Sequence, residues 1–160
     1  MKGSVLYLAG QAEEGLELVE KAMRLNPHFP HIYQLCQGQA LYVMGSYGEA
    51  VNALRQGIDR YPQSERLHLW LAASYAQIGE PERAKGHMKQ LYALNPDFSL
   101  SFLEQGSAFR YETDLENFLD GVRKATRASS GISSPVTGSA SQPQKPRDHA
   151  SAVGKVDNSP

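Results

Sequence analysis

The sequence is short of the residues that define several classes of protein. Cys36 is the only cysteine among 160 residues, which excludes a disulfide bond within the chain and favours a reducing, cytoplasmic setting. No apolar run is long enough to cross a bilayer, and the residues after Met1 lack the apolar core of a secretion signal. We therefore expect a soluble protein inside the cell.

An excess of basic charge is also missing. Lysine and arginine number 16 against 17 aspartates and glutamates, giving a formal net charge of −1. Neither the part up to Ala125 nor the remainder is basic enough to follow a phosphate backbone. We therefore do not expect a nucleic-acid partner.

The common catalytic and metal-binding motifs are absent as well. The sequence has no glycine-rich phosphate loop, no nucleophile elbow and no helical zinc motif. His28 and His31 have no acidic or thiolate neighbour in sequence to complete a metal site. His68 and His87 fall on different predicted helices, and Cys36 has no basic neighbour to activate its thiol. We expect ordinary surface or half-buried histidines, an inert buried thiol, and a non-catalytic protein without metal or cofactor.

The sequence does contain a repeat. Pro27, Pro62 and Pro96 are separated by 35 and 34 residues. The positions twelve, seventeen and twenty-four residues before these prolines hold only glycine or alanine: Gly15, Ala50 and Ala84; Gly10, Gly45 and Gly79; Gly3, Gly38 and Ala72. Small residues at fixed positions are needed where helices approach closely or where a helix ends in a left-handed cap. The period therefore predicts pairs of helices stacked in sequence order.

The limits of these helices are predicted from capping residues. One helix is expected over about Ile32–Met44 and is ended by Gly45. Gly79 is expected to end the corresponding helix of the next unit. Two capping boxes are expected to start later helices: Ser46 with Glu49, and Thr113 with Glu116.

These features resemble the tetratricopeptide repeat family. The stretch Gly38–Pro62, GQALYVMGSYGEAVNALRQGIDRYP, resembles one unit without its first residues, and a period near 34 matches this family. The resemblance implies an all-α fold: a right-handed superhelix of stacked antiparallel helix pairs that binds partners on its concave face and has no chemistry of its own. The chain then divides into a partial first repeat (1–27), a second repeat (28–62), a third repeat (63–96), a helical cap (97–125) and a disordered tail (126–160).

The two parts that follow the repeats are interpreted separately. A solenoid needs an end piece over its last apolar surface, and the cap offers one helix face with Leu115, Phe118, Leu119 and Val122. The tail from Thr126 to Pro160 has no aromatic residue and too little apolar surface to offset the entropy of ordering.

A second resemblance covers the segment Leu94–Ala125, LNPDFSLSFLEQGSAFRYETDLENFLDGVRKA. This segment resembles the carboxyl-terminal end of bacterial class III adenylate and guanylate cyclases that carry tetratricopeptide repeats behind their catalytic domain. The resemblance implies an alternative function, a detached regulatory or dimerisation region of such a cyclase. The paired aspartates that hold the metal ions in those enzymes would lie in a preceding domain, so this chain would make no cyclic nucleotide by itself.

The family resemblance also predicts which residues bind a partner. The first helix of each unit lines the concave face, and the positions off its buried stripe are Tyr7, Ile32, Leu35, Gln39, Tyr42, Arg66, Leu69, Ala73 and Gln77. Leu35, Tyr42 and Leu69 could equally be core residues at helical spacing, and both interpretations remain open at this stage.

As a set, these residues describe a mildly apolar groove with one positive charge. Family members that grip an acidic carboxyl-terminal peptide use lysine, asparagine and arginine at these positions, and Leu35, Gln39, Leu69 and Ala73 do not supply them. The groove is therefore expected to hold an apolar peptide or a helix of a protein partner.

The first repeat is incomplete in this sequence. Gly3 occupies the position that lies in the middle of the first helix in the other units, so the repeat begins part-way through that helix. This arrangement suggests either a fragment or a start codon inside a longer ancestral gene, and it predicts self-association through the incomplete edge.

Overall fold

The computed structural model describes residues 11–106, 109 and 111–130. These residues form helices and connecting turns without a strand, which confirms the predicted all-α fold. Tyr7, with the first ten residues, and residues 131–160 of the predicted tail lie outside the described residues. The helices are α2 (Ala12–Leu25), α3 (Ile32–Val43), α4 (Tyr47–Arg60), α5 (Glu65–Gln77), α6 (Pro81–Leu94), α7 (Leu100–Gly106) and α8 (Glu112–Ser129).

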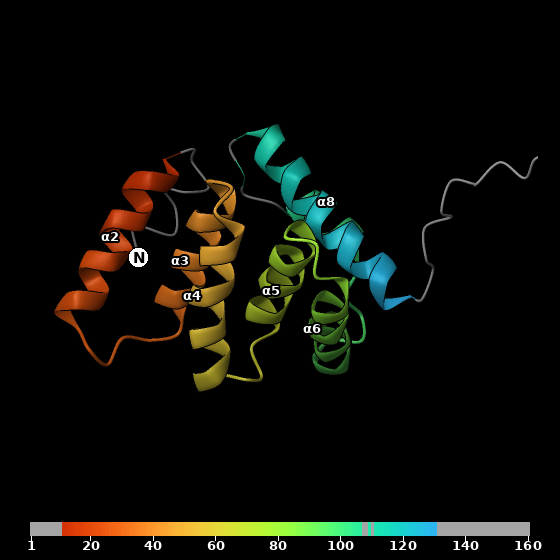
Figure 1. Ribbon diagram of the computed structural model, residues 1–160, viewed down its shortest axis with the longest axis horizontal. Coiled ribbons are helices and arrows are strands. Elements are labelled where there is room, and N and C mark those ends of the chain that lie inside the picture. Colours follow the sequence, from red (N-terminus) through yellow and green to blue (C-terminus); the bar gives the residue numbers. More distant parts are fainter. Residues whose placement is uncertain (1–10, 107–108, 110, 131–160) are drawn as a thin grey trace, which may run out of the picture.

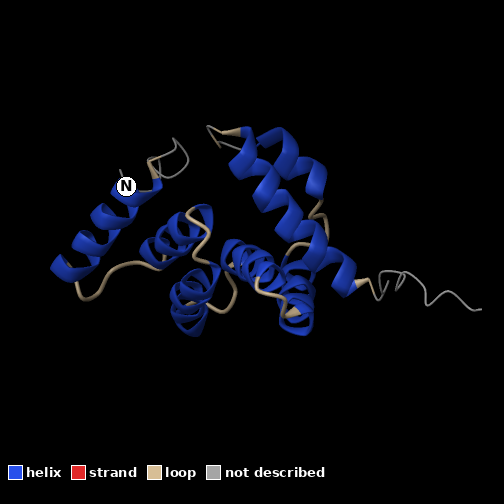
Figure 2. Ribbon diagram, turned by 45° about the horizontal axis from the view of Figure 1, so that its top comes forward, coloured by secondary structure: helices blue, strands red, loops and turns tan. Residues whose placement is uncertain are grey.

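Helices α2 to α6 stand side by side in sequence order (Figure 1). Each packs against the next: α2 on α3, α3 on α4, α4 on α5, and α5 on α6. Short connections join consecutive helices, as expected for stacked antiparallel pairs (Figure 2). This is the arrangement that the 34-residue period predicts.

The predicted glycine caps are confirmed. Gly45 and Gly79 have φ angles of 78° and 79°, the left-handed conformation that glycine adopts without a steric penalty. After α3, the backbone N–H of Ser46 donates to Leu41 O at 2.9 Å, and after α5 the N–H of Glu80 donates to Tyr75 O at 2.9 Å. Both helices therefore end in the same type of turn.

The two predicted capping boxes are not formed. Ser46 does precede α4, but its side chain makes no capping hydrogen bond. Helix α8 begins at Glu112, with Tyr111 at the N-cap position and no side-chain cap. Thr113 consequently lies inside the first turn, where helical backbone angles keep its hydroxyl from the N-cap position.

The columns of small residues mark close approaches between helices. A Cβ atom added to Gly38 in α3 would collide with the side chain of Leu54 in α4. A Cβ atom added to Gly57 would lie 3.0 Å from Cδ2 of Leu67 in the next unit. Gly38 belongs to a predicted column, whereas Gly57 lies outside the three columns. Leu54 and Leu67 are themselves fully buried, so a larger residue at either glycine would displace the core.

Helix α8 lies obliquely across α5 and α6 (Figure 1) and closes the core at the carboxyl-terminal end. Its buried residues include Phe118, Leu119 and Val122, which were predicted to share one face. The helix ends at Ser129, beyond the boundary predicted at Ala125. Ala125 is fully buried, and the helix continues past it because the burial of this turn stabilises the residues that follow.

Within the described helices, none combines the length and the apolar character needed to cross a bilayer.

Candidate functional site

Helix α8 contacts three of the predicted groove residues. Tyr42 in α3 donates a hydrogen bond from its hydroxyl to the backbone oxygen of Asn117 at 3.0 Å. The side-chain amide of Gln77, the last residue of α5, lies 3.1 Å from the same oxygen. Ala73 lies against Gly121 of α8. The chain's own helix therefore occupies this part of the predicted groove.

The remaining predicted groove residues differ in exposure. Leu35, Tyr42 and Leu69 all belong to the hydrophobic core, which is one of the two interpretations that the sequence left open. Gln39 is buried and Ile32 is half-buried. Arg66 is the one exposed residue among the eight predicted positions that the structure describes. Most of these residues are therefore covered by other parts of the chain, and a partner could contact them only if those parts moved away.

Tyr42 lies at the centre of an aromatic cluster. Its ring meets those of Tyr47, Trp70 and Phe118 edge to face, with centroid distances of 5.0, 5.3 and 5.9 Å. Phe118 stacks on Trp70 with a centroid distance of 4.0 Å. Burial raises the pKa of the Tyr42 hydroxyl above its ordinary value, so it remains a neutral donor. The sequence did not predict this cluster, because its members come from four different helices.

Gly121 makes the hydrogen bond of Tyr42 sterically possible. In an α-helix the carbonyl of residue i points toward residue i+4, and Gly121 is four residues after Asn117. A Cβ atom at Gly121 would collide with the Tyr42 hydroxyl and would lie 3.1 Å from the backbone oxygen of Ala73. The missing side chain leaves room for the hydroxyl beside the helix backbone.

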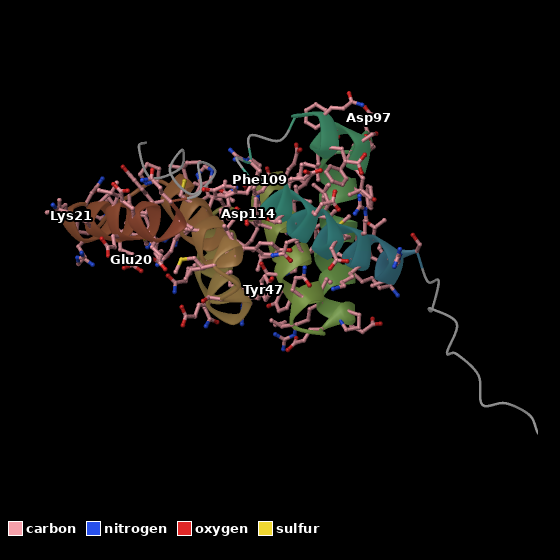
Figure 3. The ribbon with its side chains drawn as sticks, turned by 90° about the horizontal axis from the view of Figure 1, so that it is seen from above. Glu20, Lys21, Tyr47, Asp97, Phe109 and Asp114 are labelled. Atoms are coloured by element: carbon pink, nitrogen blue, oxygen red, sulfur yellow. The ribbon has the colours of Figure 1, made fainter. Side chains whose placement is uncertain are left out.

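The side chain of Asn117 is held by two helices of the repeats. Its amide nitrogen donates to the Tyr47 hydroxyl at 2.9 Å, and its amide oxygen accepts from Gln77 at 3.1 Å. Figure 3 labels Tyr47, which extends from α4 toward α8. At the outer edge, Lys124 pairs with Asp120 at 2.6 Å and donates to the side-chain oxygen of Gln77 at 3.0 Å. We call Tyr42, Tyr47, Trp70, Ala73 and Gln77 together the helix-binding site.

His68 and His87 were predicted to be ordinary surface or half-buried histidines on different helices, but they meet, and His68 is buried. Their Nδ1 atoms lie 2.9 Å apart, and Nε2 of His68 lies 2.8 Å from Pro62 O. Because a carbonyl only accepts, His68 donates from Nε2, and its Nδ1 accepts the proton of His87. Burial, and then the neighbouring His68 and Arg55, lower the pKa of His87 to about 4. The pair therefore links α5 to α6 through an uncharged His87 ring.

The described part of the chain offers no group of three or more histidine, cysteine, aspartate or glutamate side chains that could hold a metal ion. Cys36 is buried, as predicted for an inert thiol. A shallow hollow of about 380 Å³ lies beside the turn between α4 and α5, lined by His31, Arg60, Tyr61, Pro62, Gln63 and Ser64. The hollow was not predicted, since it arises only when the start of α3 meets the end of α4.

Comparison with known proteins supports the repeats. Residues 41–100 match the tetratricopeptide repeat family. The TPR repeat-containing thioredoxin TTL4 of Arabidopsis thaliana is 34% identical over 86 residues, which is 54% of this chain and 12% of that protein. The inactive TPR repeat-containing thioredoxin TTL3 of the same plant is 30% identical over 86 residues, again 54% of this chain and 12% of that protein.

A fungal relative is similar over a shorter stretch. The small glutamine-rich tetratricopeptide repeat-containing protein 2 of Mycosarcoma maydis is 35% identical over 69 residues, which is 43% of this chain and 19% of that protein. The matches therefore span between about an eighth and a fifth of these relatives' own lengths. What the three have in common with this chain is the repeat.

Proposed function

We propose that this protein is a non-catalytic adaptor of the tetratricopeptide repeat family that binds a peptide or helix of a protein partner on its concave face. The observation that carries the proposal is the contact between α8 and the groove residues Tyr42, Ala73 and Gln77. A surface that holds one helix with both apolar and polar contacts has the chemistry to hold another.

The chemistry of the site supports a protein ligand. Trp70 offers a broad apolar ring, while Tyr42 and Gln77 offer donors that reach a peptide carbonyl. Apolar area supplies affinity, and a few directed hydrogen bonds set the orientation of the ligand. The histidines that meet in the third repeat are engaged with each other and with Pro62, so a structural role suits them better than catalysis.

The proposal is tested by reversing the charge of one groove residue and measuring how much partner protein the variant captures. Arg66 is exposed on the predicted groove, so Arg66→Glu changes the surface and leaves the core intact. The matched control is Lys89→Glu, which makes the same charge reversal at an exposed residue of α6. We expect cross-linking and mass spectrometry to find a partner with the native chain and with Lys89→Glu, and much less of it with Arg66→Glu. Equal recovery with both variants would contradict binding on this face.

The cellular setting and assembly belong to the same proposal. We place the protein in the cytoplasm and expect self-association through the edge of the solenoid formed by its first repeat. Light scattering after size-exclusion chromatography should then give a mass above that of one chain, increasing with concentration. A single-chain mass at all concentrations would remove the self-association from the proposal.

A second candidate function is a regulatory or dimerisation region of a class III nucleotide cyclase. Its support is the resemblance of Leu94–Ala125, a segment that contains α7 and most of α8. In-frame coding sequence upstream that specifies a cyclase domain would favour this candidate. An independent promoter and start site would favour the adaptor.

A further inference from the structure

The repeat helices bind both the backbone and the side chains of α8. The backbone oxygen of Asn117 accepts from the Tyr42 hydroxyl and lies within hydrogen-bonding distance of the Gln77 amide. This oxygen also belongs to the turn that leads to Gly121, where the side chain is missing. A helix with a larger residue at that position would be held away from Tyr42 and Ala73.

The side chain of residue 117 is recognised independently. The Asn117 amide donates to Tyr47 with its nitrogen and accepts from Gln77 with its oxygen. The Tyr47 hydroxyl also lies 3.2 Å from the Asn117 side-chain oxygen, so a carboxylate could accept from Tyr47 and Gln77 but would lose the donor of the 2.9 Å contact, and an aliphatic side chain could make neither bond. An amide followed four residues later by a glycine is therefore the pattern that this site fits.

The apolar contacts add area to this pattern. Phe118 stacks on Trp70, and Val122 and Ala125 are fully buried on the same side of α8. The opposite edge of α8 carries the exposed ion pair between Asp120 and Lys124. Water can solvate both charges if this pair separates, so losing it costs little stability. The helix is thus amphipathic in the way that a separate helix ligand would need to be.

We propose that α8 is a resident ligand of the helix-binding site, and that the partner is an amphipathic helix with the same pattern: a side-chain amide followed four residues later by glycine. This inference rests on the proposed adaptor function and names its ligand class. The partner helix and α8 occupy the same residues, so binding requires α8 to leave. The protein is consequently inhibited by its own helix, and the measured affinity is reduced by the fraction of chains in which the site is open.

A peptide with the sequence of residues 112–129 is the probe for this proposal. It carries a fluorescent label and is added to the full chain, in which α8 competes with it. Gly121→Leu in the full chain should release α8, because the new side chain collides with Tyr42 and Ala73. We expect this variant to bind the probe at least about tenfold more tightly than the native chain, since the site is open more often.

The matched control is Gly86→Leu. Gly86 lies in α6, where an added Cβ atom meets no atom within 4 Å. This variant makes the same chemical change in a helix and should bind the probe like the native chain. A second probe with leucine in place of the glycine should bind the Gly121→Leu chain at least about tenfold more weakly than the native probe, because it meets the same collision.

Circular dichroism and thermal melting decide whether the Gly121→Leu chain is folded. If it is not, Asn117→Ala replaces it, because this change removes hydrogen bonds from α8 without adding a clash. A folded variant of either kind that binds the native probe no better than the native chain does, or that binds the leucine probe equally well, overturns the proposal.

Failure of this experiment can be told apart from failure of the adaptor function. The probe assay needs no natural partner, and the Arg66→Glu capture assay needs no release of α8. Arg66-dependent partner capture without probe exchange would overturn the proposal for α8 and leave the adaptor binding at the exposed part of the groove around Arg66. Probe exchange without any partner would leave the site as an internal contact of the fold.

Discussion

The hydroxyl of Tyr42 lies 3.0 Å from the backbone oxygen of Asn117, 75 residues later in the chain. The first residue belongs to α3 and the other to α8, so one hydrogen bond joins two helices that are separated in sequence by four others. The bond depends on Gly121, whose missing side chain gives the hydroxyl access.

Removing the hydroxyl of Tyr42 should weaken the fold without disrupting its core. In Tyr42→Phe the ring keeps its aromatic neighbours, and Gln77 still reaches the Asn117 oxygen. We expect the free energy of unfolding to fall by about 1 kcal/mol, the usual net effect of one lost hydrogen bond. Urea denaturation measures the change. Tyr61→Phe, at an exposed residue, is the control and should change stability very little.

Detaching α8 should be visible in the fluorescence of the only tryptophan. Phe118 stacks on Trp70, which is 5% exposed. Phe118→Ala removes this ring and should destabilise the α8 contact by about 3–5 kcal/mol. We expect the emission maximum of Trp70 to shift to longer wavelength as water reaches the indole. Phe102→Ala, at a side chain that is 75% exposed, should leave the spectrum unchanged. An unshifted spectrum for Phe118→Ala would contradict the stacking.

The small-residue column should tolerate no side chain at Gly38. Gly38→Ala places a Cβ atom against Leu54 and is expected to cost about 1–3 kcal/mol of stability. Leu54→Ala is itself destabilising because Leu54 is fully buried, but Gly38→Ala should cost less in the Leu54→Ala chain than in the native chain, because the shortened neighbour makes room. Gly86→Ala, in open space on α6, should instead stabilise the helix by up to about 1 kcal/mol. Thermal unfolding of these chains tests whether the column marks close helix contact.

Stability should decrease on acidification because of His87. Burial is the main cause that lowers its pKa from 6.5 to about 4. Between these values the unfolded chain binds a proton that the folded chain does not, so the free energy of unfolding is largest above pH 6.5 and falls toward pH 4. With allowance for solvent screening, we expect a loss of about 1 kcal/mol between pH 7 and pH 5.

Denaturation of His87→Gln at the two pH values isolates this contribution. The variant removes the titrating ring, so its stability should vary less with pH than that of the native chain. His28→Gln, at an exposed histidine, should retain the native dependence. Equal pH dependence in the native chain and in His87→Gln would show that the histidine pair does not carry the effect.

The helices of the repeats could be predicted because their signals are local. Gly45 and Gly79 mark helix ends by a conformation that belongs to the residue itself, and both have the positive φ that was expected. The capping boxes were less reliable. Ser46 lies at a helix start without bonding as a cap, and Thr113 is displaced into the first turn because the helix starts two residues earlier than the capping box predicted. A short motif offers a hydrogen bond, but the backbone angles around it decide whether the bond forms.

The groove was harder to predict than the helices. Helical spacing places Leu35 and Leu69 on one face, but it does not say whether that face meets water or another helix. The structure buries both. The meeting of His68 with His87 was likewise beyond prediction, because two residues on different helices come into contact only when the helices cross at a particular angle and register.

The sequence by itself determined the period, the helix pairs and the apolar face of α8, since each depends on residue spacing within a few turns of one helix. Only the tertiary structure decided what that face covers: Phe118 lies on Trp70, and the backbone beside Gly121 receives Tyr42. An amphipathic helix must bury its apolar side, but many surfaces could satisfy it. Shape and hydrogen bonding between distant parts of the chain select the one it occupies.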